Sequence, residues 1–418
     1  MKRNERETLS WGSDKSDFFG SFAAQLDRWA ESGETPESGD QDVRYFLGLQ
    51  QARLKKKGIS MELTLTPRGA ISQGKYGVTW QDEKYINRME YRSCRRERSF
   101  FKNGRRIFKS RENTILYEII TRLQYADGVE HEPYSCPNCG AASRIEELVN
   151  GCPYCGTRFL MSDLFPKVTN FYFLKDSGMS GPESKLHIKK WMLSGAAVGL
   201  ICGISGNQEA GIVALALGYM TGGAIFGYMA MCGKLLESLF LEAVRSIPLL
   251  FRTSGAKKRL TSLLTRYDPR FSYEYFVSQV LSLLKMILFS ENLSNVAAYE
   301  GRSVDASFGD IIDSAYRGAI GVRHFHMEGP YACLEAEIFM RDTYESGGRI
   351  KEKNDVFYMK LCKNVSRPSS LGFSIRHVQC RSCGGSFDAA RLRHCPYCGQ
   401  EYSLREDDWA VVGIEKGW

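Results

Sequence analysis

The chain has 418 residues and a net charge of +8, from 56 Lys and Arg against 48 Asp and Glu. This length leaves room for two or three domains, and so small an excess of positive charge excludes a chain that is basic throughout. No apolar core follows the charged start Met1–Leu9. We therefore expect no secretory signal and, because acidic residues are frequent, no organelle transit peptide.

The first two segments differ in composition. Residues 1–40 are rich in Ser, Gly, Glu and Asp and predict a mobile tail, in which an amphipathic patch at Phe18–Trp29 suits a short helix. Residues 41–130 predict a small basic mixed domain. Within it, Tyr45–Lys57 has helical character and Met61–Thr66 alternates like a half-buried strand.

The positive charge is concentrated between Lys84 and Arg111, where eleven basic residues stand against two acidic ones. We rank a solvated face with core aromatics first, contact with anionic lipid headgroups second, and nucleic-acid binding last. Nucleic acid ranks last because no nucleic-acid-binding motif accompanies the charge. A second basic cluster follows the apolar stretch described below. The lipid interpretation places both clusters at a membrane surface through Arg95, Arg96, Arg105, Arg106, Lys257, Lys258 and Arg259.

Residues 131–175 contain two knuckles of the form CPxCG, Cys136–Gly140 and Cys152–Gly156, followed by a predicted strand at Asp163–Tyr172. Paired knuckles bring four thiolates within reach of one tetrahedral Zn²⁺, and the glycines let the backbone turn around each sulfur. Four cysteines leave no position for water, so we expect a structural site, with a redox dithiol as the alternative. The ligands of this first zinc ribbon are Cys136, Cys139, Cys152 and Cys155.

An apolar stretch, Trp191–Cys232, carries one charged residue, Glu209. Its second run, Gly211–Cys232, has 22 residues and would span about 33 Å as a helix. Its first run, Trp191–Ser205, has 15 residues and would span about 22 Å, which is marginal for a bilayer. We predict a transmembrane helical hairpin over 188–232. The alternative is a buried hairpin in a soluble core.

Glycines recur every fourth residue in both runs, a spacing that lets helices pack closely in lipid. The same stripes would pair helices of two chains as well as of one, so a homo-oligomer stays open. Lys and Arg flank the stretch and are missing from its tip. We therefore expect a multi-pass protein of the cell (inner) membrane with both termini in the cytoplasm. The predicted packing glycines are Gly195, Gly199, Gly203, Gly218, Gly222, Gly223 and Gly227.

After the hairpin we expect a juxtamembrane helix over 233–258 and an α+β domain over 259–418. In that domain a long helix is predicted within Ser272–Ser290, with Ser272 as its N-cap. Two shorter helices are predicted at Leu293–Tyr299 and Ala306–Ala315.

Beyond these helices the apolar period changes to two, which indicates an antiparallel sheet. Its predicted strands are Val322–Met327, Tyr331–Thr343, Asp355–Asn364, Ser374–Cys380 and Ala410–Glu415.

A second knuckle pair interrupts the sheet as an insertion at 378–402 between the last two strands. The same argument predicts a second structural Zn²⁺ there, held by Cys380, Cys383, Cys395 and Cys398. Five cysteines belong to neither ribbon: Cys94, Cys202, Cys232, Cys333 and Cys362. In a cytoplasm-facing domain, paired knuckles indicate metal rather than disulfides.

The start Asp268-Pro269-Arg270-Phe271, the long helix with Phe276 and the closing strand Trp409–Ile414 resemble the Tim-forty-four-like domain. The resemblance covers roughly 259–414, with the second ribbon inside. It implies a cone-shaped fold of helices and a curved sheet with an apolar pocket, related to the nuclear-transport-factor-two group. It also implies membrane association, anionic-lipid contact and binding of partner proteins. Chaperone recruitment and presequence import are not carried over, because the chain shows no long chaperone-recruiting region.

Together these features predict a membrane-anchored, cytoplasm-facing adaptor with two zinc ribbons, which binds partner proteins or lipid and is not an enzyme. Raising the local concentration of its partners at the membrane would be its mechanism. One alternative is a membrane-tethered nucleic-acid-binding regulator that uses Lys84–Arg111. The other is an enzyme that uses the distal pocket. Its acid–base candidates are His324, His326, Asp305, Asp310 and Asp313.

Overall fold

The computed structural model divides the chain into two compact units, one formed by Met1–Lys175 with Lys258–Trp418 and the other by Asp176–Lys257. We call them the sheet unit and the hairpin unit and describe each by itself. The structure describes residues 18–68, 79–81, 85–123, 133–136, 139–148, 151–156, 166–175, 192–198, 219–229, 255–269, 271–294, 296–367, 377–389 and 391–417.

The first sheet of the sheet unit is antiparallel, with the strand order β1-β3-β4-β7 and β2 paired to β3. A long hairpin forms its centre, and the turn residues Asn103 and Gly104 both have positive φ, as two-residue hairpin turns require. Most of the basic stretch lies in this hairpin. The strands are β1 (Ile59–Pro67), β2 (Thr79–Gln81), β3 (Tyr85–Lys102), β4 (Arg105–Leu123) and β7 (Lys167–Lys175).

The second sheet is also antiparallel and has the order β13-β10-β9-β8. The segment of the second ribbon leaves after β10 and returns at β13, which pairs with β10, so the sheet holds both ends of the insertion. Four of the five predicted strands lie inside longer ones, whereas the described part of Ser374–Cys380 contains only a three-residue strand that belongs to the second ribbon and not to this sheet. The longer strands are β8 (Ile311–Glu328), β9 (Tyr331–Ser346), β10 (Arg349–Asn364) and β13 (Ala410–Lys416).

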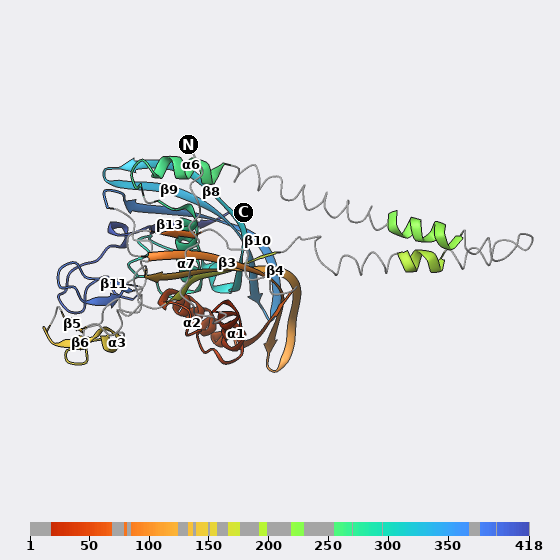
Figure 1. Ribbon diagram of the computed structural model, residues 1–418, viewed down its shortest axis with the longest axis horizontal. Coiled ribbons are helices and arrows are strands. Elements are labelled where there is room, and N and C mark those ends of the chain that lie inside the picture. The colour runs from red at the N-terminus through yellow and green to blue at the C-terminus, as the bar shows by residue number, and fades with distance from the viewer. Residues whose placement is uncertain are drawn as a thin grey trace, which may run out of the picture. The chain divides into compact units, whose positions relative to one another are not determined.

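Helices fill the space around the sheets. The helices α1 (Phe18–Ser32) and α2 (Gln41–Lys56) lie together against the first sheet (Figure 1). The helix α7 (Tyr273–Phe289) packs between α2 and the second sheet, and it is buried on all sides from Tyr275 onward. A helix that is apolar all round belongs inside a core. The shorter α6 (Ala256–Leu264) adds Leu260 and Leu264 to that core.

Both ends of α7 are capped by side chains. The predicted N-cap is confirmed, because the Ser272 hydroxyl accepts a hydrogen bond from the Tyr275 amide at 3.3 Å. At the other end Arg53 of α2 donates to the carbonyls of Leu288 and Ser290, which have no partner within the helix. A cation at a helix C-terminus is also favoured by the helix dipole.

The helix predicted at Phe18–Trp29 is confirmed as α1, but the mobile tail predicted around it is wrong from Phe18 onward, because α1 is part of the core. Its residues Phe22, Leu26 and Trp29 are almost fully buried, and the Trp29 indole donates to the Leu47 carbonyl at 3.2 Å. Amphipathic spacing was the only sign of this helix in the sequence. Residues 1–17 lie outside the described residues.

The two shorter helices predicted after α7 are also wrong. The described residues of Leu293–Tyr299 form turns and one β-bridge, and Ala306–Ala315 divides into a short 3-10 helix, η3 (Ala306–Asp310), and the start of β8. Ile311 belongs to the core around α7 and Ile312 to the core around α1 and α2. Phe308, Ile311, Ile312 and Ala315 are spaced as on one face of a helix, so the apolar pattern favours the wrong element here.

The two domains predicted at 41–130 and 259–418 belong to one compact unit of the structure. The helix α2 packs on α7, and β7 lies beside β8, where the Tyr172 and Tyr316 rings meet at 5.4 Å. Helices with antiparallel sheets confirm the α+β class. The cone shape stays a prediction.

In the hairpin unit, residues 192–198 and 219–229 are helical and lie side by side (Figure 1). A Cβ built on Gly195 would be 2.2 Å from the Gly223 carbonyl oxygen and 3.0 Å from the Gly227 Cα, so the two backbones are in contact. Gly222 faces open space. Among the described residues, no helix has the length and apolar character to cross a membrane. Gly199, Gly203, Gly218 and residues 233–254 lie outside the described residues.

Candidate functional site

The first predicted zinc ribbon brings its four cysteines together. The Sγ atoms of Cys136 and Cys155, and those of Cys139 and Cys152, lie 3.7 Å apart. Four sulfurs bound to one Zn²⁺ at about 2.3 Å lie about 3.8 Å apart, so the cluster has the size of a tetrathiolate site. A small hairpin of β5 (Pro133–Ser135) and β6 (Ala142–Arg144) and the turn helix α3 (Ile145–Leu148) complete the ribbon.

The second ribbon repeats this geometry, with Cys380 and Cys383 between β11 (His377–Gln379) and β12 (Ser386–Asp388) and with Cys395 and Cys398 after β12. Cys380 and Cys398 lie 3.6 Å apart, and Cys383 and Cys395 lie 3.7 Å apart. The knuckle glycines Gly140, Gly156, Gly384 and Gly399 all have positive φ between 72° and 75°. Both clusters are therefore compatible with Zn²⁺, and their all-sulfur ligand sets leave no open position.

The two ribbons differ in how they join the sheet unit. The second is fixed to the segment after α7: the Ala297 amide donates to the Ala389 carbonyl at 2.8 Å, and Arg393 donates to the Tyr299 carbonyl at 2.6 Å. Its apolar cluster includes Ala297 and contacts Tyr402. In the described part of the first ribbon, the apolar cluster contains only Cys136, Leu148 and Cys152.

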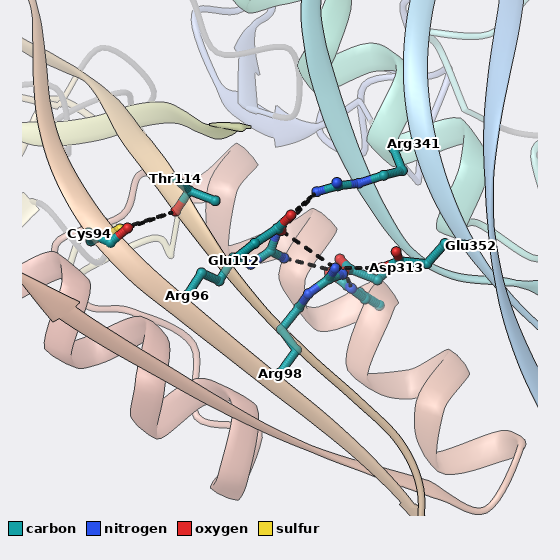
Figure 2. A network of polar contacts seen from close by, with 9 residues as sticks. Cys94, Arg96, Arg98, Glu112, Thr114, Asp313, Arg341 and Glu352 are labelled. Carbon is teal, nitrogen blue, oxygen red and sulfur yellow. Dashed lines mark hydrogen bonds and ion pairs between the residues drawn. The ribbon is translucent and has the colours of Figure 1, made fainter. Parts of the chain in front are cut away.

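A buried ionic cluster joins the two sheets (Figure 2). Arg96 and Arg98 on β3 both bind Asp313 on β8, Arg96 at 3.1 Å. Arg98 also reaches Glu352 on β10 at 2.7 Å. Arg341 on β9 contacts Glu112 on β4 through two hydrogen bonds, of 2.6 and 2.8 Å. The central arginines and Asp313 are at least nine-tenths buried.

The arginines and acids of the cluster stabilise each other's charges. Burial alone would raise the pKa of Asp313, but the charges of Arg96 and Arg98 outweigh it and lower the pKa to about 2. Gln50 of α2 donates to the other Asp313 oxygen at 3.1 Å. Burial, together with the neighbouring Arg98, lowers the pKa of Arg96 to about 10. The cluster therefore holds the two sheets together and offers no free charge to a ligand.

Lys285 of α7 lies close to this cluster, inside the apolar core. Its Nζ donates to the Phe171 carbonyl at 2.8 Å and lies 4.5 Å from the Phe46 ring centre. Burial lowers the pKa of Lys285 to about 7, against the opposing charge of Asp313.

Arg96 is wrongly placed among the residues predicted at a lipid surface. It is buried, and its guanidinium carbon lies 4.2 Å from the centre of the Phe173 ring. Arg95 is half-buried and has interaction partners. The exposed members are Arg105, Arg106, Lys257, Lys258 and Arg259. Since Arg88 and Arg98 are also buried, the stretch is not a continuous basic surface for nucleic acid.

The structure does not bring His324 and His326 together with Asp313. His324 and His326 are exposed near the turn that ends β8, whereas Asp313 lies near the start of the same strand and binds the buried arginines. Strand residues rise about 3.3 Å each, so eleven positions separate Asp313 from His324 by roughly 36 Å. A bulge between Arg323 and His326 puts His324 at φ 48°, so the two histidines do not simply share one face.

A hollow of about 750 Å³ lies beside η3 and the β9–β10 hairpin. Two of the predicted acid–base candidates, Asp305 and Asp310, line it together with Tyr344, Asp355 and Lys416, which the sequence does not single out. Tyr344 donates to Asp355 and accepts from Lys416 at 2.5 Å. Burial and the hydrogen bond to Asp355 raise the pKa of Tyr344, and burial keeps the pKa of nearby Asp342 well above its usual range. Charged residues line this hollow, in contrast to the apolar pocket implied by the resemblance. No local motif marks Tyr344, Asp355 or Lys416 in the sequence.

The chain matches no protein-family model, no curated protein and no solved structure. The resemblance to the Tim-forty-four-like domain therefore stays a prediction.

Proposed function

We propose that the chain is a membrane-anchored adaptor that faces the cytoplasm. The hairpin unit anchors the chain, and two structural Zn²⁺ ions stabilise the sheet unit. A basic face of β10 binds an acidic segment of a partner protein. The contact between Gly195 and the Gly223 backbone is the observation that carries the anchor, because so close an approach is the packing that glycine stripes permit in lipid.

The side chains around this contact support the anchor. Leu193, Ile225, Phe226 and Met229 are 60–73% exposed on the two helices. An apolar surface of this kind indicates burial against lipid or protein. Lys185, Lys189 and Lys190 precede the apolar stretch, and more basic residues follow it, so both flanks belong on the cytoplasmic side.

Membrane fractionation tests the anchor. We expect the protein to stay in the membrane pellet after high-salt and alkaline carbonate washes and to leave it only in detergent. An arginine at a helix centre costs about 2.5–3.5 kcal/mol on insertion, so Phe226→Arg should lower the membrane-bound fraction strongly. Tyr154→Arg is the matched control, since Tyr154 is 71% exposed on the first ribbon of the sheet unit. Release of the wild type by carbonate would reject the anchor.

The binding surface is supported by the alternation of side chains along β10. Arg349, Lys351 and Lys353 are exposed and lie on one face of the strand at the rim of the hollow. Glu352, on the opposite face, binds Arg98 in the ionic cluster, so the sheet unit holds this strand rigidly. Three cations two residues apart match an extended acidic segment with the same repeat.

In-cell crosslinking of the intact chain tests this surface. We expect a defined set of partners to be lost in Arg349→Glu/Lys351→Glu and kept in Arg105→Glu/Arg106→Glu, which reverses two exposed cations at the tip of the β3–β4 hairpin. Equal partner sets for both variants would reject the β10 surface. A loss of binding to anionic vesicles without any loss of protein partners would assign it to lipid instead.

A further inference from the structure

A row of metal-ligating side chains crosses three neighbouring strands of the second sheet. His326 on β8 lies directly opposite Cys333 on β9, and Cys333 lies directly opposite Cys362 on β10. Residues that face each other across an antiparallel pair point to the same side of the sheet. The register therefore places an imidazole and two sulfurs side by side.

Glu328 adds a carboxylate to this row. It follows His326 by two residues on β8, and its Oε2 lies 3.9 Å from the Cys333 Sγ. One ligand atom from each of His326, Glu328 and Cys333 lies within 4.8 Å of the others. The paired sulfurs of the two ribbon clusters are 3.6–3.7 Å apart, so these three ligand atoms are already close to the spacing around one bound ion.

The backbone orients the histidine. His324, at positive φ in the bulge, presents its carbonyl oxygen 3.2 Å from the Nδ1 of His326. When Nδ1 donates to this carbonyl, Nε2 carries the lone pair, which is the arrangement that metal-binding histidines use. Cys333 and Cys362 are buried, whereas His326 and Glu328 are exposed, so the row has a shielded sulfur side and an open entrance.

In the structure Cys333 and Cys362 form a disulfide, with their Cα atoms 4.3 Å apart. No local pattern in the sequence assigns either cysteine a partner. Disulfides in a reducing compartment are typically transient or redox-sensing. The disulfide removes both thiolates from the row and leaves only two ligands, too few for a stable zinc site.

We propose that His326, Glu328, Cys333 and Cys362 form a third Zn²⁺ site that exists only while the two cysteines are reduced. A thiol reductant opens the disulfide, and two thiolates then complete a ligand set of two sulfurs, one nitrogen and one oxygen. A peroxide closes it again. One thiolate attacks the peroxide to give a sulfenic acid and hydroxide, and the second attacks the sulfenic sulfur and expels another hydroxide. Two electrons pass from sulfur to peroxide, two protons convert the hydroxides to water, and Zn²⁺ leaves.

Metal content of the full-length protein in detergent tests the proposal. The phosphine-reduced, zinc-loaded and desalted wild type should hold three Zn²⁺ per chain, the third in addition to those of the two ribbon clusters. Protein oxidised with limiting hydrogen peroxide should hold two and yield a Cys333–Cys362 linked peptide by mass spectrometry. Two Zn²⁺ in the reduced wild type would overturn the site, and three in the disulfide form would overturn the switch.

Variants of the exposed ligands keep the test independent of folding. His326→Ala and Glu328→Gln should each bind the third Zn²⁺ at least tenfold more weakly while both ribbons stay loaded. His324→Asn is the matched control, because Asn tolerates positive φ and keeps the carbonyl; it should retain three. Loading the reduced protein with Co²⁺ gives a second readout. The absorption of Co²⁺ bound to sulfur, nitrogen and oxygen together at the third site should vanish in His326→Ala. Retention of the third ion in both ligand variants would overturn the proposal.

Discussion

Arg98 and Asp313 are 215 positions apart in the chain and form a direct, buried ion pair between the two sheets. Other cations of the N-terminal half find acids of the C-terminal half in the same way. Lys57 lies 3.2 Å from both Asp310 and Glu345, and Lys102 lies 3.0 Å from Glu345. Part of the excess of positive charge in the first half therefore serves as counter-ions for acids of the second half.

Asp313→Asn should destabilise the sheet unit by about 3–5 kcal/mol, because it leaves Arg96 and Arg98 buried without their shared counter-ion. Denaturant unfolding followed by tryptophan fluorescence measures this loss. Lys56→Ala is the control, since the Lys56–Glu291 pair crosses between the same halves but is exposed. An exposed pair contributes about 0–1 kcal/mol. Equal effects of the two variants would show that the buried cluster adds nothing to stability.

A structural feature could be predicted from the sequence when the residues that form it lie close together in the chain. The knuckle spacing, the Ser272 cap and the alternation of β1 are set by residues a few positions apart, and the structure agrees with all three. The ionic cluster is not local. Arg96 and Arg98 looked like surface residues because Asp313, the acid that they share, occurs more than 200 residues later.

The missed strand start has a different cause. Phe308, Ile311, Ile312 and Ala315 have helical spacing, and nothing local distinguishes them from a helix. Ile311 and Ile312 point into two different cores, which only the assembled sheets create. The hollow beside Tyr344 was missed for the same reason, because Asp355 and Lys416 reach Tyr344 from separate strands.

Lys285 should make stability depend on pH. Its folded pKa is about 7, below the ordinary value of 10.5, so the unfolded chain binds more protons between these two pH values. The free energy of unfolding should therefore rise as pH increases through this window, by up to about 1.4 kcal/mol per pH unit. Denaturant unfolding at pH 7 and pH 9 measures the slope. Lys285→Met should remove this contribution, and an unchanged slope would show that Lys285 keeps its proton in the folded chain.

The second ribbon should contribute more to the sheet unit than the first. Cys398→Ser and Cys155→Ser are matched changes, since each replaces the exposed last ligand of its cluster. Cys398→Ser should loosen the contacts of Ala389 and Arg393 with the segment after α7 and lower the midpoint of thermal unfolding. Cys155→Ser should release zinc with a smaller shift. Calorimetry with zinc analysis measures both, and an equal or reversed order would contradict the docking argument.

Gly195→Ala should separate the two helices of the hairpin unit, because its Cβ would lie 2.2 Å from a backbone oxygen that no rotamer change can move. Gly222→Ala is the matched control, since nothing lies within 4 Å of its Cβ position. Alanine also favours a helix over glycine by roughly 1 kcal/mol, so the control should be neutral or slightly stabilising. Hydrogen exchange in detergent, read on peptides covering 192–198 and 219–229, measures the effect. We expect at least tenfold faster exchange in Gly195→Ala alone, and similar exchange in both variants would show that the helices do not depend on this contact.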